Sequence, residues 1–220
     1  MKKIAILAFA AASGSAIAQF TQGNLVVTIV GDGSGAAGNH PVVVRQYTKA
    51  GAQVGTDLSL SNLFGNRYVT ATYGETSEAA LTLSGDGKYL MTGGYDLTPF
   101  DPSFDTFGSP RVIASIDASG TIKLSASFDP PEGDGVRGIY SPDGTSWVYT
   151  SGDGGLTFGD ASGYSKQELA PGVSSRMVQV RNGVYWFNGS NAFQGDNRFV
   201  TYDGTTLTDL FATPNGASSR

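Results

Sequence analysis

The sequence predicts an all-β protein built from antiparallel hairpins, and three observations support this prediction. Glycine accounts for 31 of the 220 residues while charged residues make up only 15%, a composition typical of turn-rich β proteins. Beyond residue 19, short alternating or β-branched runs replace the 3.6-residue period of a helix. Asn-Gly or Asp-Gly pairs separate many of these runs, and both tolerate the positive φ angles of a tight hairpin turn.

The first segment, MKKIAILAFAAASGSAIA, does not share this pattern. It holds two lysines, then an apolar run, then Ala-Ile-Ala, which are the three regions of a secretory signal peptide. The run is too short to cross about 30 Å of hydrocarbon as a helix. We therefore expect residues 1–18 to be a bacterial signal peptide. Residues 19–220 are expected to form one domain that is secreted, periplasmic or attached to the cell surface.

The expected elements are a single strand followed by six hairpins. The strand covers 24–30, and the hairpins cover 41–60, 79–95, 111–128, 136–150, 176–187 and 198–210. Their turns centre on Lys-Ala-Gly, Gly-Asp-Gly, Ala-Ser-Gly, Pro-Asp-Gly, Asn-Gly and Asp-Gly, in that order. Each turn contains a glycine, which adopts a left-handed conformation without steric cost.

Two kinds of hairpin alternate along the chain, one with an aromatic-rich second strand and one more amphipathic. Two hairpins make a four-stranded antiparallel sheet of about 40–55 residues, which is the size of a propeller blade. The sequence therefore predicts a β-propeller-like array of about four blades, at 20–60, 74–128, 133–172 and 174–212. The alternatives are a β-sandwich or a β-solenoid. Nearly continuous apolar strands favour the propeller over the sandwich, because a sandwich leaves its outer faces in contact with water.

The array is expected to be either a four-bladed ring, closed by the strand at 24–30, or part of a longer ring. Four blades is the lower end of the usual range for propellers. The sequence ends in TPNGASSR, with no evident closing strand. This ending favours the incomplete ring.

Composition excludes several partners and chemistries. The net charge is −5 without basic clusters, so neither nucleic acid nor an anionic lipid surface is an expected partner. No later run of about 20 apolar residues predicts a transmembrane segment. Cysteine is absent, which excludes disulfides, thiolate metal sites and cysteine nucleophiles.

Catalytic residues are not evident from the sequence. His40 is the sole histidine, so a site of several imidazoles is impossible and a Ser-His-Asp triad would need this residue. The remaining route is a carboxylate pair, as in a secreted glycoside hydrolase or lyase. Acidic residues in expected loops are Glu75, Glu78, Asp96, Asp101, Asp105, Glu132 and Asp134. No spacing among them selects a pair, so the sequence favours a protein that is not an enzyme.

Cofactors are not expected either. Four glycine-rich loops, GDGSG, SGDGK, EGDGVR and SGDGG, offer oxygen ligands that calcium could use. Each of these loops has one Asp, and the EF-hand spacing of several acids is absent. Calcium is therefore a weak candidate.

A long insert, LTPFDPSFDTFGSP at 97–110, joins two of the expected hairpins. It carries Phe100, Phe104 and Phe107 among prolines and aspartates. These rings can act as plugs that hold a surface loop in place. They can also contact a carbohydrate or a protein, because exposed aromatic side chains on loops are common in binding sites.

One motif resembles a known family. Ser151, Asp153, Gly155 and Thr157 occupy alternate positions and are followed by Phe158, which resembles the Asp-box, S-x-D-x-G-x-T-W, of sialidase-like propellers (BNR repeats). The resemblance implies a turn between outer strands of a blade, with the Ser and Asp side chains bonded to local backbone and the aromatic ring packed underneath. Phe158 replaces the usual Trp, and the full motif occurs once.

The resemblance implies a structural role and carries no activity. Sialidases need an arginine triad, a tyrosine nucleophile with a Glu partner and an early Arg-Ile-Pro segment, and no Arg-Ile-Pro occurs here. The stretches EAALTLSGDGKYLMTGGYD and RMVQVRNGVYWFNG are similar to secreted bacterial propeller-like proteins. We therefore expect a secreted, non-catalytic binding or surface module that recognises a glycan or a protein through its blade loops.

Overall fold

The computed structural model describes residues 19–31, 37–63, 65–75, 77–169, 172–189 and 198–212. Within these ranges the chain forms sixteen strands and no helix, and all strand pairs inside the sheets are antiparallel. The prediction of an all-β protein of antiparallel sheets is confirmed. The expected signal peptide and the final TPNGASSR lie outside the described residues. No helix long and apolar enough to span a membrane occurs in the described ranges.

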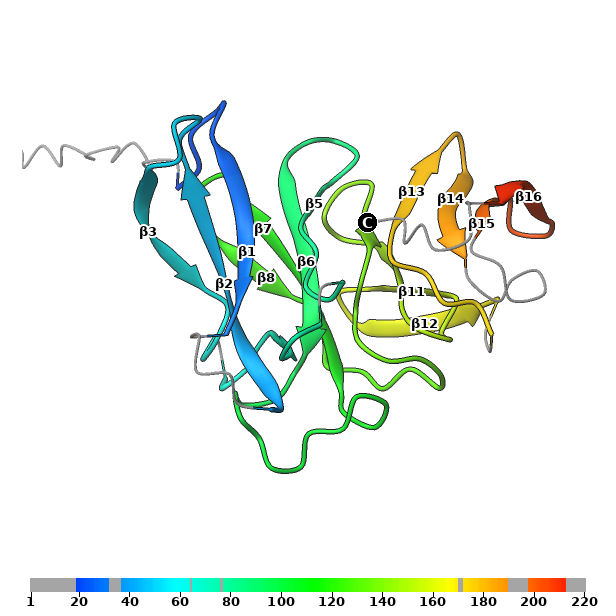
Figure 1. Cartoon of the computed structure of the whole chain (residues 1–220), viewed down its shortest axis with the longest axis horizontal. Helices are drawn as coiled ribbons and strands as arrows, with labels where there is room; N and C mark the ends of the chain where they lie inside the picture. The colour runs from blue at the N-terminus through cyan, green and yellow to red at the C-terminus, as the bar shows by residue number, and fades with distance from the viewer. Residues whose placement is uncertain are drawn as a thin grey trace, which may run out of the picture.

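The first sheet has eight strands (Figure 1). They are β1 (Leu25–Val30), β2 (Asn39–Tyr47), β3 (Gln53–Ser59), β4 (Thr70–Thr72), β5 (Thr82–Leu83), β6 (Tyr89–Tyr95), β7 (Arg111–Asp117) and β8 (Ile122–Leu124). The order is β1-β2-β4-β6-β7-β8, with β3 beside β2 and β5 beside β6. The long strand β2 joins two halves, because its first residues pair with β4 while the rest pairs with β1 and β3. The first two predicted units are thus fused into one sheet.

The other two sheets have four strands each, as predicted for blades. One contains β9 (Ile139–Tyr140), β10 (Trp147–Thr150), β11 (Leu156–Asp160) and β12 (Gly163–Glu168), and the other contains β13 (Val178–Arg181), β14 (Val184–Gly189), β15 (Arg198–Tyr202) and β16 (Leu207–Ala212). In both, the strands lie in chain order from one edge to the other. The hairpin β11–β12 was not predicted, although its turn at 160–163 reads Asp-Ala-Ser-Gly, as does the predicted turn at 117–120.

Three hydrophobic cores separate successive parts of this array. The first lies between the two halves of the large sheet and is mainly aliphatic; the second, between β6–β7 and β9–β10, contains Phe128, Trp147 and Tyr149. The third lies between β10–β11 and the last sheet. Strand β10 sends Trp147 and Tyr149 into one core and Val148 into the next. Strand β10 is therefore covered on both faces, which explains why its apolar residues are continuous in sequence.

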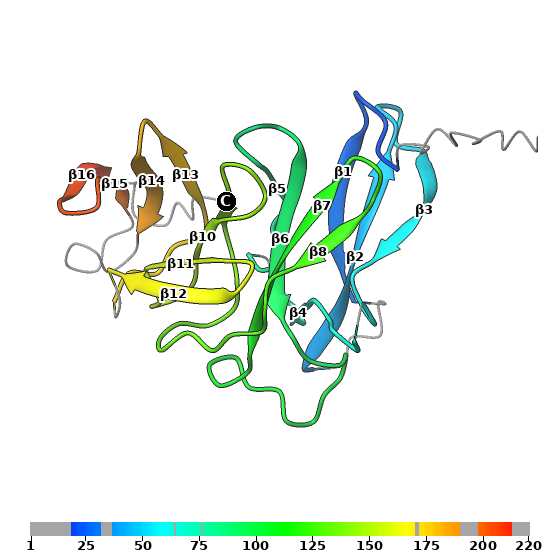
Figure 2. The same cartoon turned by 180° about the vertical axis from the view of Figure 1, so that it is seen from behind.

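Besides the fusion of the first two units, the arrangement differs from the expected ring at strand β1. Strand β1 pairs along its whole length with β2, from Leu25↔Tyr47 to Val30↔Val42, so it belongs to the first sheet and does not close a ring with the last one. The reason is local: β1 and β2 both alternate, and their pairing turns Val26, Val42 and Val44 into the same core. Figures 1 and 2 show β3 and β16 at opposite sides of the molecule.

Candidate functional site

The insert at 97–110 leaves the end of β6 and forms the loop at the bottom of Figure 1. Its first part is fixed by Asn39, whose side chain is fully buried. The Asn39 amide donates to the Thr98 carbonyl oxygen (2.7 Å) and its oxygen accepts from the Asp101 amide (2.9 Å). The Phe100 amide donates to the Asn39 backbone carbonyl (2.8 Å). Three hydrogen bonds therefore hold this end of the loop to β2.

The second part of the loop is fixed by Arg111, the first residue of β7. Its guanidinium is fully buried and donates to the carbonyl oxygens of Thr106 (2.7 Å) and Gly133 (3.1 Å). It also lies over the ring of Tyr95, 4.7 Å from the centroid. Phe104 packs edge-on against the same tyrosine ring at 4.9 Å. This half of the loop is therefore anchored by one cation and one aromatic pair.

The structure separates the three phenylalanines that the sequence singled out. Phe104 is anchored, whereas Phe100 and Phe107 are 47% and 63% exposed. Phe100 has a φ of 61°, which is unusual for a bulky residue and occurs most often at constrained functional sites. Tyr73, which the sequence did not suggest, is 43% exposed nearby. We call Tyr73, Phe100 and Phe107 the aromatic loop surface.

His40 connects two members of this surface. It is fully buried, with the ring of Phe100 edge-on at 4.7 Å and the ring of Tyr73 tilted at 4.8 Å. The histidine therefore supports the exposed rings from beneath. Only the tertiary fold brings His40, Tyr73 and Phe100 together, since they come from β2, the turn after β4 and the insert.

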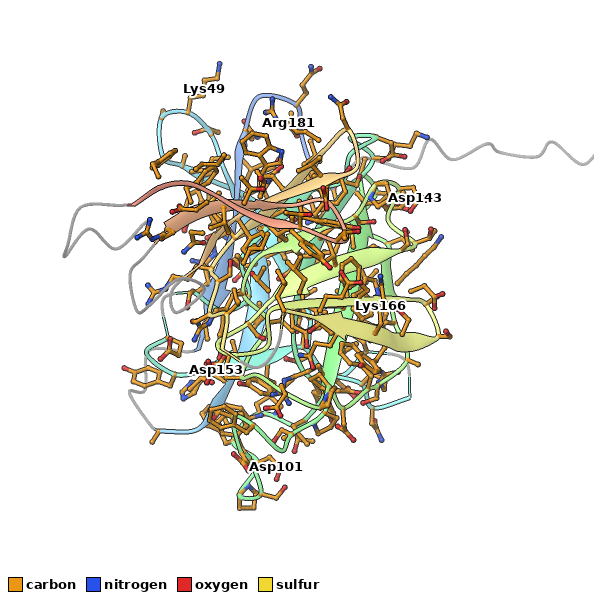
Figure 3. All side chains as sticks on the ribbon, turned by 90° about the vertical axis from the view of Figure 1, so that its right-hand side faces the viewer. Lys49, Asp101, Asp143, Asp153, Lys166 and Arg181 are labelled. Carbon is orange, nitrogen blue, oxygen red and sulfur yellow. The ribbon has the colours of Figure 1, made fainter. Side chains whose placement is uncertain are left out.

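The carboxylates of the loop are already used by the loop itself. Asp101 accepts from the Ser103 amide (2.8 Å) and hydroxyl (2.6 Å) and from the Thr98 hydroxyl (3.0 Å). Asp105 accepts from the Phe107 amide (3.1 Å). Figure 3 shows Asp101 at the bottom of the molecule. These bonds rigidify the loop and occupy oxygens that a sugar hydroxyl would otherwise use.

The Asp-box residues form the loop between β10 and β11, which are the middle strands of their sheet, so the expected position between outer strands is wrong. The expectation that the Ser151 and Asp153 side chains bond to local amides is also wrong. Among the described residues, the buried Ser151 hydroxyl has no hydrogen-bond partner. Asp153 is exposed with a φ of 62°, and its carboxylate makes no hydrogen bond to another described residue.

Backbone bonds replace those side-chain bonds. The Ser175 amide donates to the Ser151 carbonyl and the Gly155 amide donates to the Val173 carbonyl, both at 3.0 Å. The loop is thus tied to the segment before β13. Within the motif, the Thr157 hydroxyl accepts from the side-chain amide of Gln167 (3.1 Å). The ring of Phe158 packs edge-on against the ring of Tyr185, with centroids 5.3 Å apart.

A buried group of ionisable side chains comes closest to an enzyme site. Glu78 is 8% exposed and accepts from the Thr72 amide (2.7 Å) and from the Tyr95 hydroxyl (3.2 Å). Burial raises the pKa of Glu78, although the hydrogen bonds from Thr72 act in the opposite direction. Repulsion from the negative charge of Asp134 raises the pKa of Glu78 as well. Asp134 itself pairs with Arg137 at 2.7 Å.

The group of Glu78, Tyr95 and Arg111 has the residue types of a hydrolase site, but it is closed to solvent. Tyr95 and Arg111 are fully buried, and Glu78 is nearly so. A substrate would have to displace the bonds that hold the insert in place. Of the other acids considered from the sequence, Asp96 pairs with Arg67 at 2.5 Å, and Glu75 and Glu132 are exposed. In the described part of the chain, no three His, Asp or Glu residues are placed to hold a metal ion.

Five turns share an Asp-x-Ser/Thr pattern in which the carboxylate accepts from the backbone amide two residues later; their aspartates are Asp101, Asp117, Asp143, Asp160 and Asp203. The hydrogen bonds lower the pKa of each of these carboxyls. The unfolded chain therefore binds more protons than the folded one at acidic pH. The stability that these turns contribute is present above about pH 4 and is lost as the pH falls.

We expect urea unfolding to show a decreasing free energy of unfolding from pH 5 to pH 2.5, with a smaller decrease in the Asp117→Asn variant. Glu78 acts in the opposite sense, because its raised pKa favours the folded state at low pH. Glu78→Gln should therefore steepen the decrease. A constant or rising free energy of unfolding on acidification of the unmutated chain would contradict this account.

Comparisons with known proteins add no functional assignment. No protein-family model matches the sequence, and no curated protein matches it. A solved structure described as "Crystal Structure of Mitotic Checkpoint Complex" is 14% identical, with 96% of this chain and 89% of that chain covered. Its TM-score of 0.31 is too low to support an inference about fold or function.

Proposed function

We propose that this chain is a secreted, non-catalytic binding module, and that the aromatic loop surface contacts a partner protein. The observation that supports this most directly is the exposure of Phe100 and Phe107 on a loop that is bonded at both ends. Ordering a loop in advance lowers the entropy cost of binding. Exposed rings of this kind supply most of the energy of many interfaces.

A protein is favoured over a glycan at this surface because of the polar groups around it. Sugar hydroxyls need donors and acceptors that are not already paired. The oxygens of Asp101 accept from Ser103 and Thr98, and Asp105 bonds to the Phe107 amide. The exposed rings of Phe100 and Phe107 remain accessible, and they fit an apolar patch on a protein.

We also infer that the sheets are blades of a propeller-like array. Support comes from the three successive cores and from strand β10, which is covered on both faces. A two-layer sandwich has one core and two wet outer faces. The first and last sheets lie at opposite sides in Figures 1 and 2, so the array is an open arc in the described residues.

Hydrolysis is a second candidate, favoured by the raised pKa of Glu78 and its 3.2 Å hydrogen bond from Tyr95. A glycoside hydrolase needs an acid of raised pKa beside a second carboxylate. Burial of Glu78, Tyr95 and Arg111 makes this candidate weaker than binding. Turnover of generic aryl glycosides that is lost in Glu78→Gln would favour it.

The binding proposal is tested with a double variant, Phe100→Asn with Phe107→Ser. Asparagine tolerates the positive φ at position 100, so the melting temperature should stay within about 3 °C, the change expected from surface substitutions. The amount of protein that the immobilised double variant captures from a cell-envelope extract should be at least tenfold lower than the amount that the unmutated chain captures.

The control is Phe211→Ser, which removes a ring of similar exposure, 58%, from the last sheet and should not affect capture. Purified candidates from the capture would then be titrated against all three proteins. Equal binding to the unmutated chain and to the double variant would overturn the proposal. Loss of binding to a glycan array in the double variant would assign the surface to a glycan instead.

A further inference from the structure

A hollow of about 410 Å³ lies between the sheet β9–β12 and the strands β13–β14. Its volume falls within the range of about 300–1,000 Å³ that is usual for ligand sites. The walls carry Tyr140, Phe158, Tyr185 and Lys166, and we call these four residues the aromatic groove. The groove shares no residue with the aromatic loop surface, and the inference below goes beyond the proposed function.

The rings of the groove are held in place by their neighbours. Phe158 and Tyr185 meet edge-to-face, with centroids 5.3 Å apart and an interplanar angle of 87°. The ring of Tyr185 also lies against the ring of Tyr202, with centroids 6.4 Å apart. The groove therefore presents fixed ring surface and does not depend on ligand binding to order it.

The rim of the groove carries one cation and one anion. The Lys166 ammonium lies 4.7 Å from the centroid of the Phe158 ring and pairs with Glu168 at 2.5 Å. The lysine side chain is 58% exposed, so its ammonium remains accessible. Figure 3 shows Lys166 on β12, on the side that faces the viewer. Ser146 and Ser165 add hydroxyls to the lining.

These charges select among ligand classes. A cationic ligand would compete with Lys166 for the ring face, since that position is already taken by its ammonium. An anionic ligand would meet Glu168 and the net charge of −5. A purely apolar ligand would make no hydrogen bond to the hydroxyls of Ser146 and Ser165 in the lining. A neutral ligand with hydroxyls is compatible with both members of the ion pair.

We propose that the aromatic groove binds a neutral saccharide. A pyranose ring has an apolar C–H face, which can stack on the ring of Tyr185. Its hydroxyls both donate and accept, so they can accept from the Lys166 ammonium and bond to the hydroxyls of Ser146 and Ser165. The proposal thus accounts for fixed rings beside an exposed ammonium and two hydroxyls in one hollow.

The test is an array of neutral and acidic oligosaccharides probed with the purified chain, followed by calorimetric titration of the neutral oligosaccharides that bind. Two variants address the two features: Tyr185→Leu removes a ring but keeps an apolar side chain, and Lys166→Gln removes the charge. Each should weaken binding at least tenfold. Thermal melts separate loss of binding from loss of fold.

The matched control is Lys88→Gln, which breaks a similar surface pair, with Asp86 at 3.3 Å, outside the groove and should bind as the unmutated chain does. The absence of binding to neutral glycans would overturn the proposal, as would binding that both groove variants retain. Preference for acidic glycans would also overturn it. Binding that is lost only in the Phe100→Asn, Phe107→Ser variant would move the glycan to the aromatic loop surface.

Discussion

Replacing Arg111 with alanine is expected to lower the free energy of unfolding by about 3 kcal/mol, one of the two largest effects of a single substitution predicted for this chain. The arginine is fully buried and donates to the backbone of two separate loops, at Thr106 and Gly133. Truncation leaves these carbonyl oxygens without their donor and leaves a cavity beside Tyr95. Relief of the buried charge offsets part of the loss.

Chemical denaturation measures this effect, and Arg111→Met distinguishes its causes. Methionine keeps most of the apolar volume but donates no hydrogen bond, so a loss close to that of alanine would assign the effect to the hydrogen bonds. Hydrogen exchange of residues 97–110 should become faster in both variants, because the second anchor of the loop is gone. An alanine variant within about 1 kcal/mol of the unmutated chain would contradict the anchoring role.

Gly94→Ala is expected to be equally damaging, at about 3 kcal/mol, for a steric reason. Gly94 lies in β6 and pairs with Val112 of β7. A Cβ atom at this position would collide with the carbonyl oxygen of Thr70 in β4, and backbone at a strand pairing cannot move aside as a flexible side chain can. Strand β4 would separate from β6 at the place where the two halves of the first sheet meet.

The control for this substitution is Gly183→Ala in the β13–β14 turn. No atom lies within 4 Å of a Cβ at Gly183, but its φ is 77°, so about 1–2 kcal/mol is expected from backbone strain alone. Thermal and urea unfolding of the two variants should rank Gly94→Ala as clearly the less stable. Equal stabilities would show that the β4–β6 contact is not a close packing point.

Much of the local structure follows from the sequence. The six predicted hairpins all correspond to strand pairs, because Asp-Gly and Asn-Gly turns and alternating residues act over short distances. Strand β4 and the hairpin β11–β12 were missed. Strand β4 has only three residues. The turn that joins β11 to β12 carries the same Asp-Ala-Ser-Gly residues as the predicted turn at 117–120, and in it the Ser162 amide donates to the Asp160 carboxylate (2.7 Å).

The candidate sites were less predictable. The sequence singled out Phe100, Phe104 and Phe107, but the separation of one anchored ring from two exposed rings depends on Tyr95. The Asp-box match identified Phe158 as a packing residue without indicating the hollow beside it. No sequence signal associated Lys166 with that hollow, since the pairing of β11 with β12 brings it over Phe158.

The sequence by itself determined the all-β class, the position of the turns and the absence of cysteine and multi-histidine chemistry. Each of these depends on composition or on neighbours a few residues apart. Only the tertiary structure decided that β1 joins the first sheet, that Arg111 anchors the insert and that a groove lies between two sheets. These features require contacts between segments far apart in the chain, and side-chain pattern alone does not specify which sheet faces cover one another.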